Sequence, residues 1–119
     1  MSYPREAEEY LPLTPPVFHV LVALADGDKH GYAILKEVAD RTDGRVQLSS
    51  GTLYAIIKRL LQDGLIDEID ERPDHDDERR RYYGLTAFGR HVAAAEAERM
   101  EDLLSAARAK RLIRKARHT

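Results

Sequence analysis

The side chains best suited to bind a polyanion lie in two short runs of the sequence. The first run combines small hydroxyl residues and a glycine with a tyrosine and two cations, and the second is three consecutive arginines. Hydroxyls and glycine at the start of a helix let the backbone approach a phosphate closely, and each arginine can neutralise one phosphate. The residues predicted to bind a nucleic acid, through its phosphates or its base edges, are therefore Ser49, Ser50, Gly51, Thr52, Tyr54, Lys58, Arg59, Arg79, Arg80 and Arg81.

Each run also has a plainer interpretation. The first fits an ordinary amphipathic helix with solvated charges, and helical spacing alone does not separate the two. The arginines directly follow a cluster of acids, Asp74, Asp76, Asp77 and Glu78, which they could neutralise. In a strand at most two of the three arginines can face one backbone, because alternate residues point to opposite sides. The acids are also unexpected in a segment that contacts phosphate.

Other kinds of site find little support. The chain has no cysteine, which excludes disulfides, thiolate nucleophiles and cysteine zinc sites. The histidines are scattered, and no serine–histidine–aspartate order, carboxylate pair or glycine-rich phosphate loop stands out. Residues 74–77 are a weak metal-site candidate, because adjacent residues on a turn rarely converge on one ion. We expect no enzymatic activity, no cofactor and no metal.

Length and charge favour a small soluble protein with a polarised surface. The chain has 119 residues, 43% of them hydrophobic, and a formal net charge of −2, which suits one domain with an appended helix. Residues 45–62 contain three basic residues and no acid, and residues 109–119 contain five and no acid, so one face can be positive. No apolar stretch is long enough to span a membrane and no secretion signal is evident, so a cytoplasmic location is expected.

Turn and capping residues divide the chain into helices and strands. Thr14 is expected to cap the first helix through its hydroxyl, and Thr86 to cap the last. The first expected helix begins at Thr14-Pro15-Pro16 and ends before residues 26–28, and the second runs from Gly31 to near residue 43. The third is capped by Ser49 or Ser50 and ends at residues 63–64. Two strands over 65–71 and 80–85 follow, and a final helix runs from residue 87 to about 115.

Three short helices followed by a two-stranded hairpin form the winged helix-turn-helix arrangement, so the expected fold is mainly α-helical with a small β-hairpin. In that arrangement the third helix enters the major groove of DNA, while the hairpin lies on the backbone or minor groove. The long last helix carries an apolar stripe at alternating intervals of four and three residues, which three short helices cannot cover alone. The stripe predicted to pack on a second subunit is Ala93, Ala97, Met100, Leu104 and Ala107.

The predicted organisation has three parts. Residues 1–13 form an N-terminal arm, which either packs on a partner subunit or is disordered. Residues 14–86 form the winged helix-turn-helix domain, and residues 87–119 form a C-terminal dimerisation helix with a basic tail. The tail is open to two interpretations, since cations touch DNA but also suit any helix C-terminus.

Four blocks carry a family resemblance: residues 24–34 (LADGDKHGYAI), 48–60 (LSSGTLYAIIKRL), 63–66 (DGLI) and 80–89 (RRYYGLTAFG). Together, in this order, they resemble the PadR family of bacterial transcriptional regulators. The resemblance implies a winged-helix DNA-binding domain and, as in the small PadR subclass, a single C-terminal helix that makes a homodimer. It places Ser49–Tyr54 at the start of the recognition helix and Arg80–Arg81 on the wing. His30–Tyr32 open the second helix, where a mainly structural role is expected and a phosphate contact is left open.

The resemblance also implies regulation, because family members commonly act as repressors released by a small molecule at or near the dimer interface. Two features depart from many relatives. Ser50 and Ala55 stand where proline is common, which bears on helix entry and base preference, and the chain lacks the tryptophans that sandwich flat ligands in some relatives. The hypothesis is a homodimeric, ligand-responsive repressor that binds a pseudo-palindromic site in double-stranded DNA. The alternative is a winged-helix protein-interaction module without DNA binding, which the acidic wing and negative net charge favour.

Overall fold

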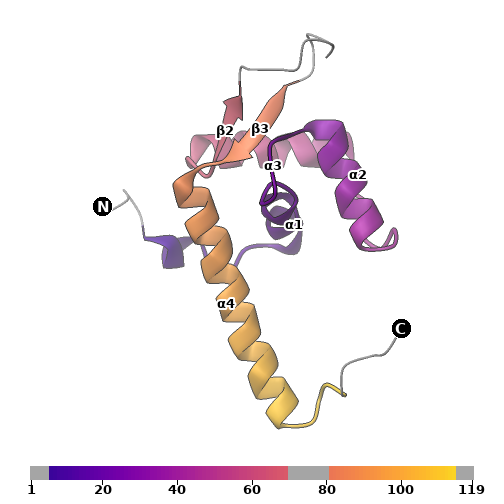
Figure 1. Cartoon of the computed structure of the whole chain (residues 1–119), viewed down its shortest axis with the longest axis vertical. Coiled ribbons are helices and arrows are strands. Elements are labelled where there is room, and N and C mark those ends of the chain that lie inside the picture. Colours follow the sequence, from indigo (N-terminus) through magenta and orange to yellow (C-terminus); the bar gives the residue numbers. More distant parts are fainter. Residues whose placement is uncertain (1–5, 70–80, 115–119) are drawn as a thin grey trace.

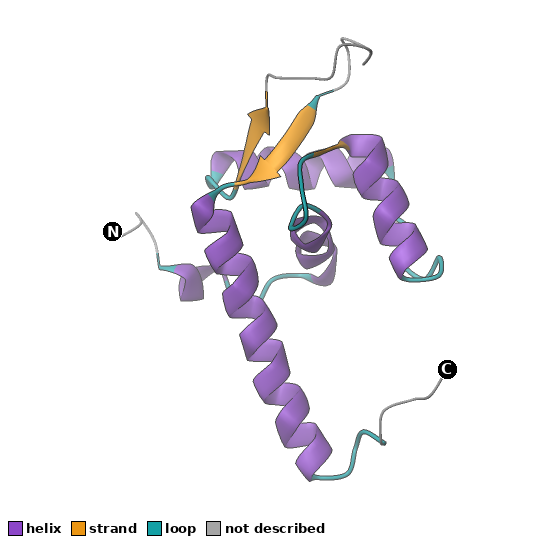
Figure 2. Cartoon of the chain, in the orientation of Figure 1, coloured by secondary structure: helices purple, strands orange, loops and turns teal. Residues whose placement is uncertain are grey.

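The computed structural model describes residues 6–69 and 81–114 and confirms a mainly helical chain with a small antiparallel sheet (Figure 1, Figure 2). Three helices and the sheet form the body, and the last helix extends away from it. The elements in chain order are a 3₁₀ helix η1 (Ala7–Tyr10), α1 (Pro15–Ala23), β1 (Lys29–His30), α2 (Gly31–Arg41), α3 (Ser50–Gln62), β2 (Ile66–Ile69), β3 (Tyr82–Leu85) and α4 (Ala87–Ala109).

Side chains cap three of the four α-helices at their N-termini. His30 Nδ1 accepts from the backbone N–H of Ala33 at 3.2 Å, which caps α2. Ser49 Oγ, one of the two predicted candidates, caps α3, and Thr86 caps α4 as predicted. Thr14 occupies the N-cap position of α1, but the predicted hydrogen bond to its side chain is wrong. Prolines at the first two helical positions carry no N–H, so α1 has fewer donors to satisfy there.

The sheet has one strand more than predicted. Its order is β1-β3-β2, with both pairs antiparallel. β1 is only two residues long, Lys29 opposite Tyr83 and His30 opposite Tyr82, too short to show the alternation by which strands are recognised in sequence. Because β1 leads directly into α2, its pairing with β3 fixes the start of α2 beside the wing strands. Part of the predicted hairpin, residues 70–80, lies outside the described residues.

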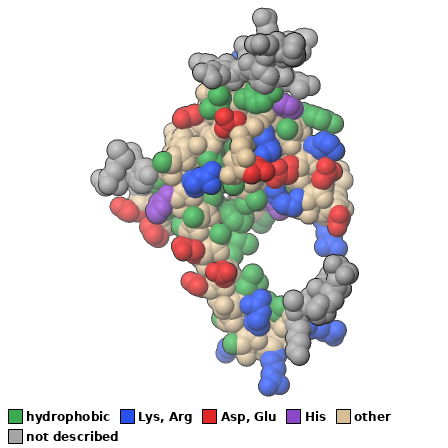
Figure 3. Space-filling model, viewed as in Figure 1, with side chains coloured by type: hydrophobic (Ala, Val, Ile, Leu, Met, Phe, Trp, Pro, Cys, Tyr) green, Lys and Arg blue, Asp and Glu red, His purple; other side chains and the backbone are tan. Residues whose placement is uncertain are grey.

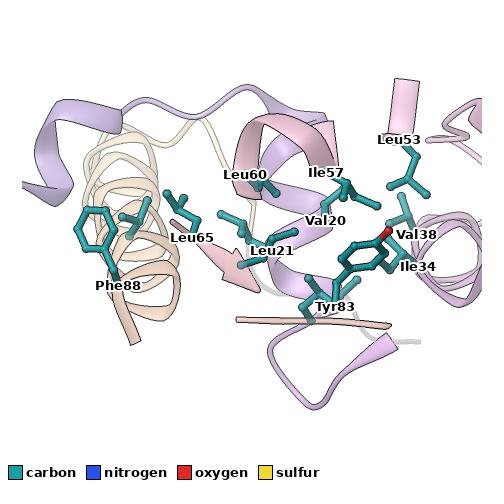
Figure 4. Packing of buried hydrophobic residues seen from close by; sticks show 14 of the residues in the cluster. Val20, Leu21, Ile34, Val38, Leu53, Ile57, Leu60, Leu65, Tyr83 and Phe88 are labelled. Carbon is teal, nitrogen blue, oxygen red and sulfur yellow. The ribbon is translucent and has the colours of Figure 1, made fainter. Parts of the chain in front are cut away.

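The core lies between α1, α2, α3, the sheet and the first turns of α4 (Figure 4). α1 is central, with Val20 and Leu21 fully buried. α4 reaches the core through Gly89, where a Cβ atom would collide with the backbone carbonyl of Leu65. The same carbonyl accepts from the backbone N–H of Thr86 at 3.0 Å, and Thr86 Oγ1 donates to the carbonyl of Gly64 at 2.7 Å. The first turn of α4 is thus held directly against the turn that follows α3.

α4 is shorter than predicted. It ends at Ala109, whereas the alanine-rich sequence without proline predicts a helix to about residue 115. Arg111 adopts a left-handed conformation (φ 64°), and the N–H of Leu112 returns to the carbonyl of Ala107 at 2.9 Å. This is the hydrogen-bonding pattern of a Schellman motif, which reverses the chain at a helix end. The first basic residues of the predicted tail therefore form the helix end, and residues 115–119 lie outside the described part.

The described part of the arm packs on α4 of its own chain. The Tyr10 and Phe88 rings meet edge to face at 5.6 Å between centroids, and the backbone N–H of Leu13 donates to Glu96 Oε2 at 2.9 Å. Glu96 is only 1% exposed and is also paired with Arg99. The hydrogen bond from Arg99 lowers the pKa of Glu96; burial opposes this shift, and the Leu13 bond supports it.

The contacts of Glu96 with Leu13 and Arg99 predict a contribution to the free energy of unfolding that depends on pH. Because its pKa is lower in the folded protein than the ordinary 4.5, the Glu96 carboxylate stabilises the fold above that pH and loses this contribution as the pH falls. We expect Glu96→Gln to lower the free energy of unfolding at pH 7, and the difference from wild type to become smaller as the pH falls from 4.5 toward 3. Urea unfolding at both pH values measures the difference. If wild type and variant differed in their free energy of unfolding by the same amount at both pH values, the charge of Glu96 would have no part in stabilising the fold.

Candidate nucleic-acid interface

The surface of α3 opposite the core is made of small and polar residues. Leu53, Ile57 and Leu60 are buried, and a rotation of about 100° per residue places the opposite face on the far side of the helix. That outer face consists of Gly51, Ala55, Lys58 and Gln62, all of which are exposed. The structure thereby brings Gly51, Ala55 and Lys58 together on one face and adds Gln62, which the sequence prediction missed although the helical period gives its position.

The hydroxyl residues at the start of α3 are exposed but partly engaged. Ser49 Oγ accepts from the backbone N–H of Thr52, and the two side-chain hydroxyls are 3.0 Å apart. Ser50 is exposed beside them. Gly51 has no atom near the position of a Cβ except Ser49 Oγ at 4.0 Å, so its surroundings are open to an approaching backbone.

The two cations of α3 are available at its surface. Within the described part of the chain Lys58 forms no salt bridge, and Arg59 lies 3.9 Å from Asp63 with its side chain 80% exposed. An exposed pair of this kind contributes at most about 1 kcal/mol and is screened by salt. A phosphate could therefore replace Asp63 as the partner of Arg59.

Tyr54 lies on the flank of α3 that faces α2. It is 50% exposed, but a Cβ atom on Gly31 would collide with its hydroxyl and lie 3.0 Å from its Cζ. The glycine that opens α2 thus leaves the space in which the Tyr54 ring sits. The DNA contact of Tyr54 stays a prediction, and the structure gives this side chain a packing role between the two helices.

The wing is described only in part. Arg81 is exposed and lies 3.5 Å from Glu68 Oε1 on β2. This cross-strand pair agrees in part with the plainer interpretation, in which the arginines neutralise nearby acids, although Glu68 precedes the acidic cluster. Arg79, Arg80 and the acids at 74–78, together with the weak metal candidate at 74–77, lie outside the described residues.

The predicted dimerisation stripe divides into two parts along α4. Ala93 packs against the core of its own chain, so it forms part of the body. Further along, Ala97 is exposed, and Met100 and Leu104 are 40% and 47% exposed. Leu103, which the stripe omitted, is 64% exposed. The half-buried Ala107 receives the hydrogen bond that ends the helix.

A pocket of about 380 Å³ lies where this stripe meets α1. Its apolar wall includes Phe18 and Val22 of α1 and Met100 of α4, and Glu96 and Arg99 also line it. His19 lies at the same pocket, 3.1 Å from an Arg41 guanidinium nitrogen. Burial, and then the Arg41 charge, lower the pKa of His19. The pocket offers apolar area beside both signs of charge.

Two other kinds of site are missing from residues 6–69 and 81–114. No group of three or more histidine, aspartate or glutamate side chains there could hold a metal ion. No helix in the same ranges is long and apolar enough to cross a membrane. The described residues do offer the α3 surface, the wing strands, the pocket beside α1 and the far half of α4. Along α4, acidic side chains lie near the middle and basic ones near the end (Figure 3).

The sequence matches the transcriptional regulator PadR-like family over residues 20–95, from α1 into α4. The chain belongs to this family. PadR-like proteins are DNA-binding transcriptional regulators and not enzymes, so the predicted resemblance, the fold class and the regulatory role are confirmed at this level.

Relatives from three bacteria support the assignment. The transcriptional regulator Rv3488 of Mycobacterium tuberculosis is 35% identical over 85 residues, which are 71% of this chain and 75% of that protein. A PadR family transcription regulator from Clostridium difficile R20291 has a TM-score of 0.67 at 25% identity, covering 77% of this chain and 93% of the other. A transcriptional regulator from Clostridium thermocellum has a TM-score of 0.65 at 26% identity, covering 88% and 94%.

Two further curated relatives are matched over less of their length. The matching segments span 64% of one and 22% of the other. What those whole proteins do is therefore no guide to the partners of this chain, and the residues that touch DNA must be argued from the site itself.

The contact between Gly31 and Tyr54 predicts a coupled pair of substitutions. We expect Gly31→Ala to lower the free energy of unfolding by about 1–3 kcal/mol, because the new methyl group displaces the Tyr54 ring. Adding Tyr54→Phe removes the atom in closest contact and should recover part of the loss. Gly51→Ala is the matched control, since the open space there predicts no loss. Urea unfolding measures the free energy of unfolding of each variant. If the loss in the double variant equalled the sum of the losses in the two single variants, the two residues would not be in repulsive contact.

Proposed function

We propose that this chain is a sequence-specific regulator that forms a homodimer and binds double-stranded DNA through α3 of each subunit. The observation that carries the proposal is the outer face of α3, which exposes Gly51, Ala55, Lys58 and Gln62, while the whole helix lacks an acidic residue. A helix of this width fits the major groove, where amide and ammonium groups read base edges and phosphates.

The proposed contacts follow from the position of each group. The start of α3, with Ser49, Ser50, Gly51 and Thr52, approaches the backbone, and Tyr54 flanks it. Lys58 and Arg59 supply charge further along the helix, and Arg79, Arg80 and Arg81 supply it from the wing. Phosphate contacts of this kind account for much of the affinity and make it depend steeply on salt.

More specifically, we propose that the protein is a repressor that a small molecule releases from DNA. The pocket between α1 and α4 supports this form, because it adjoins the uncovered stripe of α4. A ligand there would lie beside the proposed subunit interface and could alter the distance between two α3 helices. A cytoplasmic location, where the DNA lies, remains a prediction.

The alternative is a protein-interaction module without DNA binding. The net charge of −2 and the Arg81–Glu68 pair favour it, because both reduce the positive field. Salt dependence separates the two functions, since DNA binding releases counterions from the duplex and weakens as salt rises.

If the chain binds DNA, its affinity should fall measurably as the salt concentration rises. We expect tight, competitor-resistant binding either to the region upstream of the protein's own coding sequence or to duplexes selected from a randomised pool. Lys58→Ala should weaken binding and reduce the slope of log K against log salt by about 0.9, the value for one phosphate contact. Arg114→Ala, an exposed cation beyond the far end of α4, is the control. Fluorescence anisotropy across salt concentrations measures both, and no retained duplex from either source would favour the interaction module.

The charge pattern of α4 supports an antiparallel pairing of two subunits. Glu98, Glu101 and Asp102 lie along its middle, whereas Arg108 and Lys110 lie at its end. Two copies that run in opposite directions bring the basic end of each toward the acidic middle of the other, and a two-fold axis makes the contact self-complementary. Met100, Leu103 and Leu104 would supply the buried apolar area.

The dimer is tested by one charge placed on the stripe. We expect Leu104→Glu to convert the protein to a monomer, because a carboxylate on each copy would be buried at the interface. Ser105→Glu adds the same charge next to it but points away from the stripe, and should leave the dimer intact. Sedimentation velocity gives the masses. A dimer in both variants would remove α4 from the interface.

A further inference from the structure

Tyr32, near the start of α2, is the most exposed aromatic side chain among the described residues. It is 67% exposed, against 50% for Tyr54. Its ring is nevertheless held in place, because it stacks on His30 with centroids 6.5 Å apart and planes 18° apart. A large side chain that is exposed yet ordered loses little conformational entropy when it binds a partner.

The His30 ring on which Tyr32 rests is itself fixed from two other directions. Its Nδ1 accepts the backbone N–H of Ala33, which fixes the ring to the first turn of α2. The Tyr82 ring of β3 meets it edge to face at 5.3 Å and 84°. Tyr32 is therefore positioned by a stack that runs from a wing strand through His30.

The same stack places Tyr32 beside the proposed DNA-binding face. A Cβ atom on Gly31 would collide with the Tyr54 hydroxyl and lie 3.5 Å from Leu53, so the residue that precedes Tyr32 faces the first turns of α3. His30, two residues before Tyr32, pairs with Tyr82 in the sheet and so contacts a strand of the wing. Tyr32 thus lies where α2, α3 and the wing strands meet.

The charge around Tyr32 is compatible with a phosphate. Lys36 lies one turn further along α2 and is paired with Asp40 at 3.0 Å, both side chains being more than 60% exposed. Such an exposed pair is weak, so the ammonium group can turn toward an anion at little cost. Of the nearby acids, Glu37 is paired with Arg41 and Lys29, and the Asp28 carboxylate lies against Gly84.

We propose that the Tyr32 hydroxyl donates a hydrogen bond to a phosphate of the DNA that α3 binds, as an addition to the α3 and wing contacts. The inference rests on the proposed DNA-binding function. Tyrosine is among the side chains that make backbone contacts of this kind, and a rigid phenol sets where the duplex backbone lies relative to α3. Tyr54, whose hydroxyl faces Gly31, acts as a positioning residue that holds α2 and Tyr32 at the correct place beside α3.

Removing one oxygen tests the contact. Tyr32→Phe keeps the ring on His30 and removes only the donor. We expect about tenfold weaker binding to a duplex that the wild-type full-length protein selects from a randomised pool. Because the phenol is neutral, the loss should be the same at every salt concentration, leaving the slope of log K against log salt unchanged. The urea unfolding midpoint should not move, since the hydroxyl is exposed.

A matched control is Tyr10→Phe, which removes a phenol from the arm that packs on α4. We expect it to leave DNA affinity within about twofold of wild type. Equal affinity of Tyr32→Phe and wild type would overturn the contact and leave the proposed function standing. A loss of affinity matched by a lower unfolding midpoint would also overturn it, because the hydroxyl would then act on folding. Failure of the wild type to select any duplex would overturn both proposals.

Discussion

The arrangement of the molecule depends on one close approach of two backbones, between Gly89 of α4 and Leu65 after α3. A side chain at position 89 would occupy the place of the Leu65 carbonyl, and that carbonyl also receives the N–H of Thr86. No long side chain lies between the two segments at this point, so the direction of α4 is set by the turn that ends α3. Because α4 carries the uncovered apolar stripe and α3 carries the proposed groove-binding face, any pairing of two α4 helices also fixes the separation of two α3 helices.

A second set of contacts holds the other end of α3. There Gly31 receives the Tyr54 ring, and β1 joins the start of α2 to the wing. The arm adds a third contact, since Leu13 is bound by the buried Glu96. α3 is therefore fixed at its start by α2 and at its end by α4, while Gly51, Ala55, Lys58 and Gln62 on its outer face are exposed. Among the described residues, the outer face of α3 and the far half of α4 are therefore both exposed.

The sequence predicts the parts of this structure that depend on local chemistry. The spacing of buried residues predicts α2, and hydroxyl caps together with that spacing predict α3 and the start of α4, because the energies involved arise within a few residues of the chain. The missed features depend on contacts between distant segments. β1 exists through its pairing with β3, the arm is placed by Glu96, and the collision that involves Gly31 is visible only once α3 lies beside it. The early end of α4 rests on the left-handed Arg111, a conformation for which arginine gives no sequence signal.

The net negative charge is compatible with a DNA-binding surface because of where the acids are engaged. In the described residues Asp26, Asp40, Glu37, Glu68 and Glu96 each have a cationic partner. All five pairs lie outside α3, which has two cations and no acid; one of these cations, Arg59, lies 3.9 Å from Asp63 just after the helix. Lys29 is the cation that engages Asp26, and it also lies 3.5 Å from Glu37. A phosphate that approaches α3 would therefore meet unpaired or weakly paired cations first, and the charge of the whole chain would act on it only through screened, longer distances.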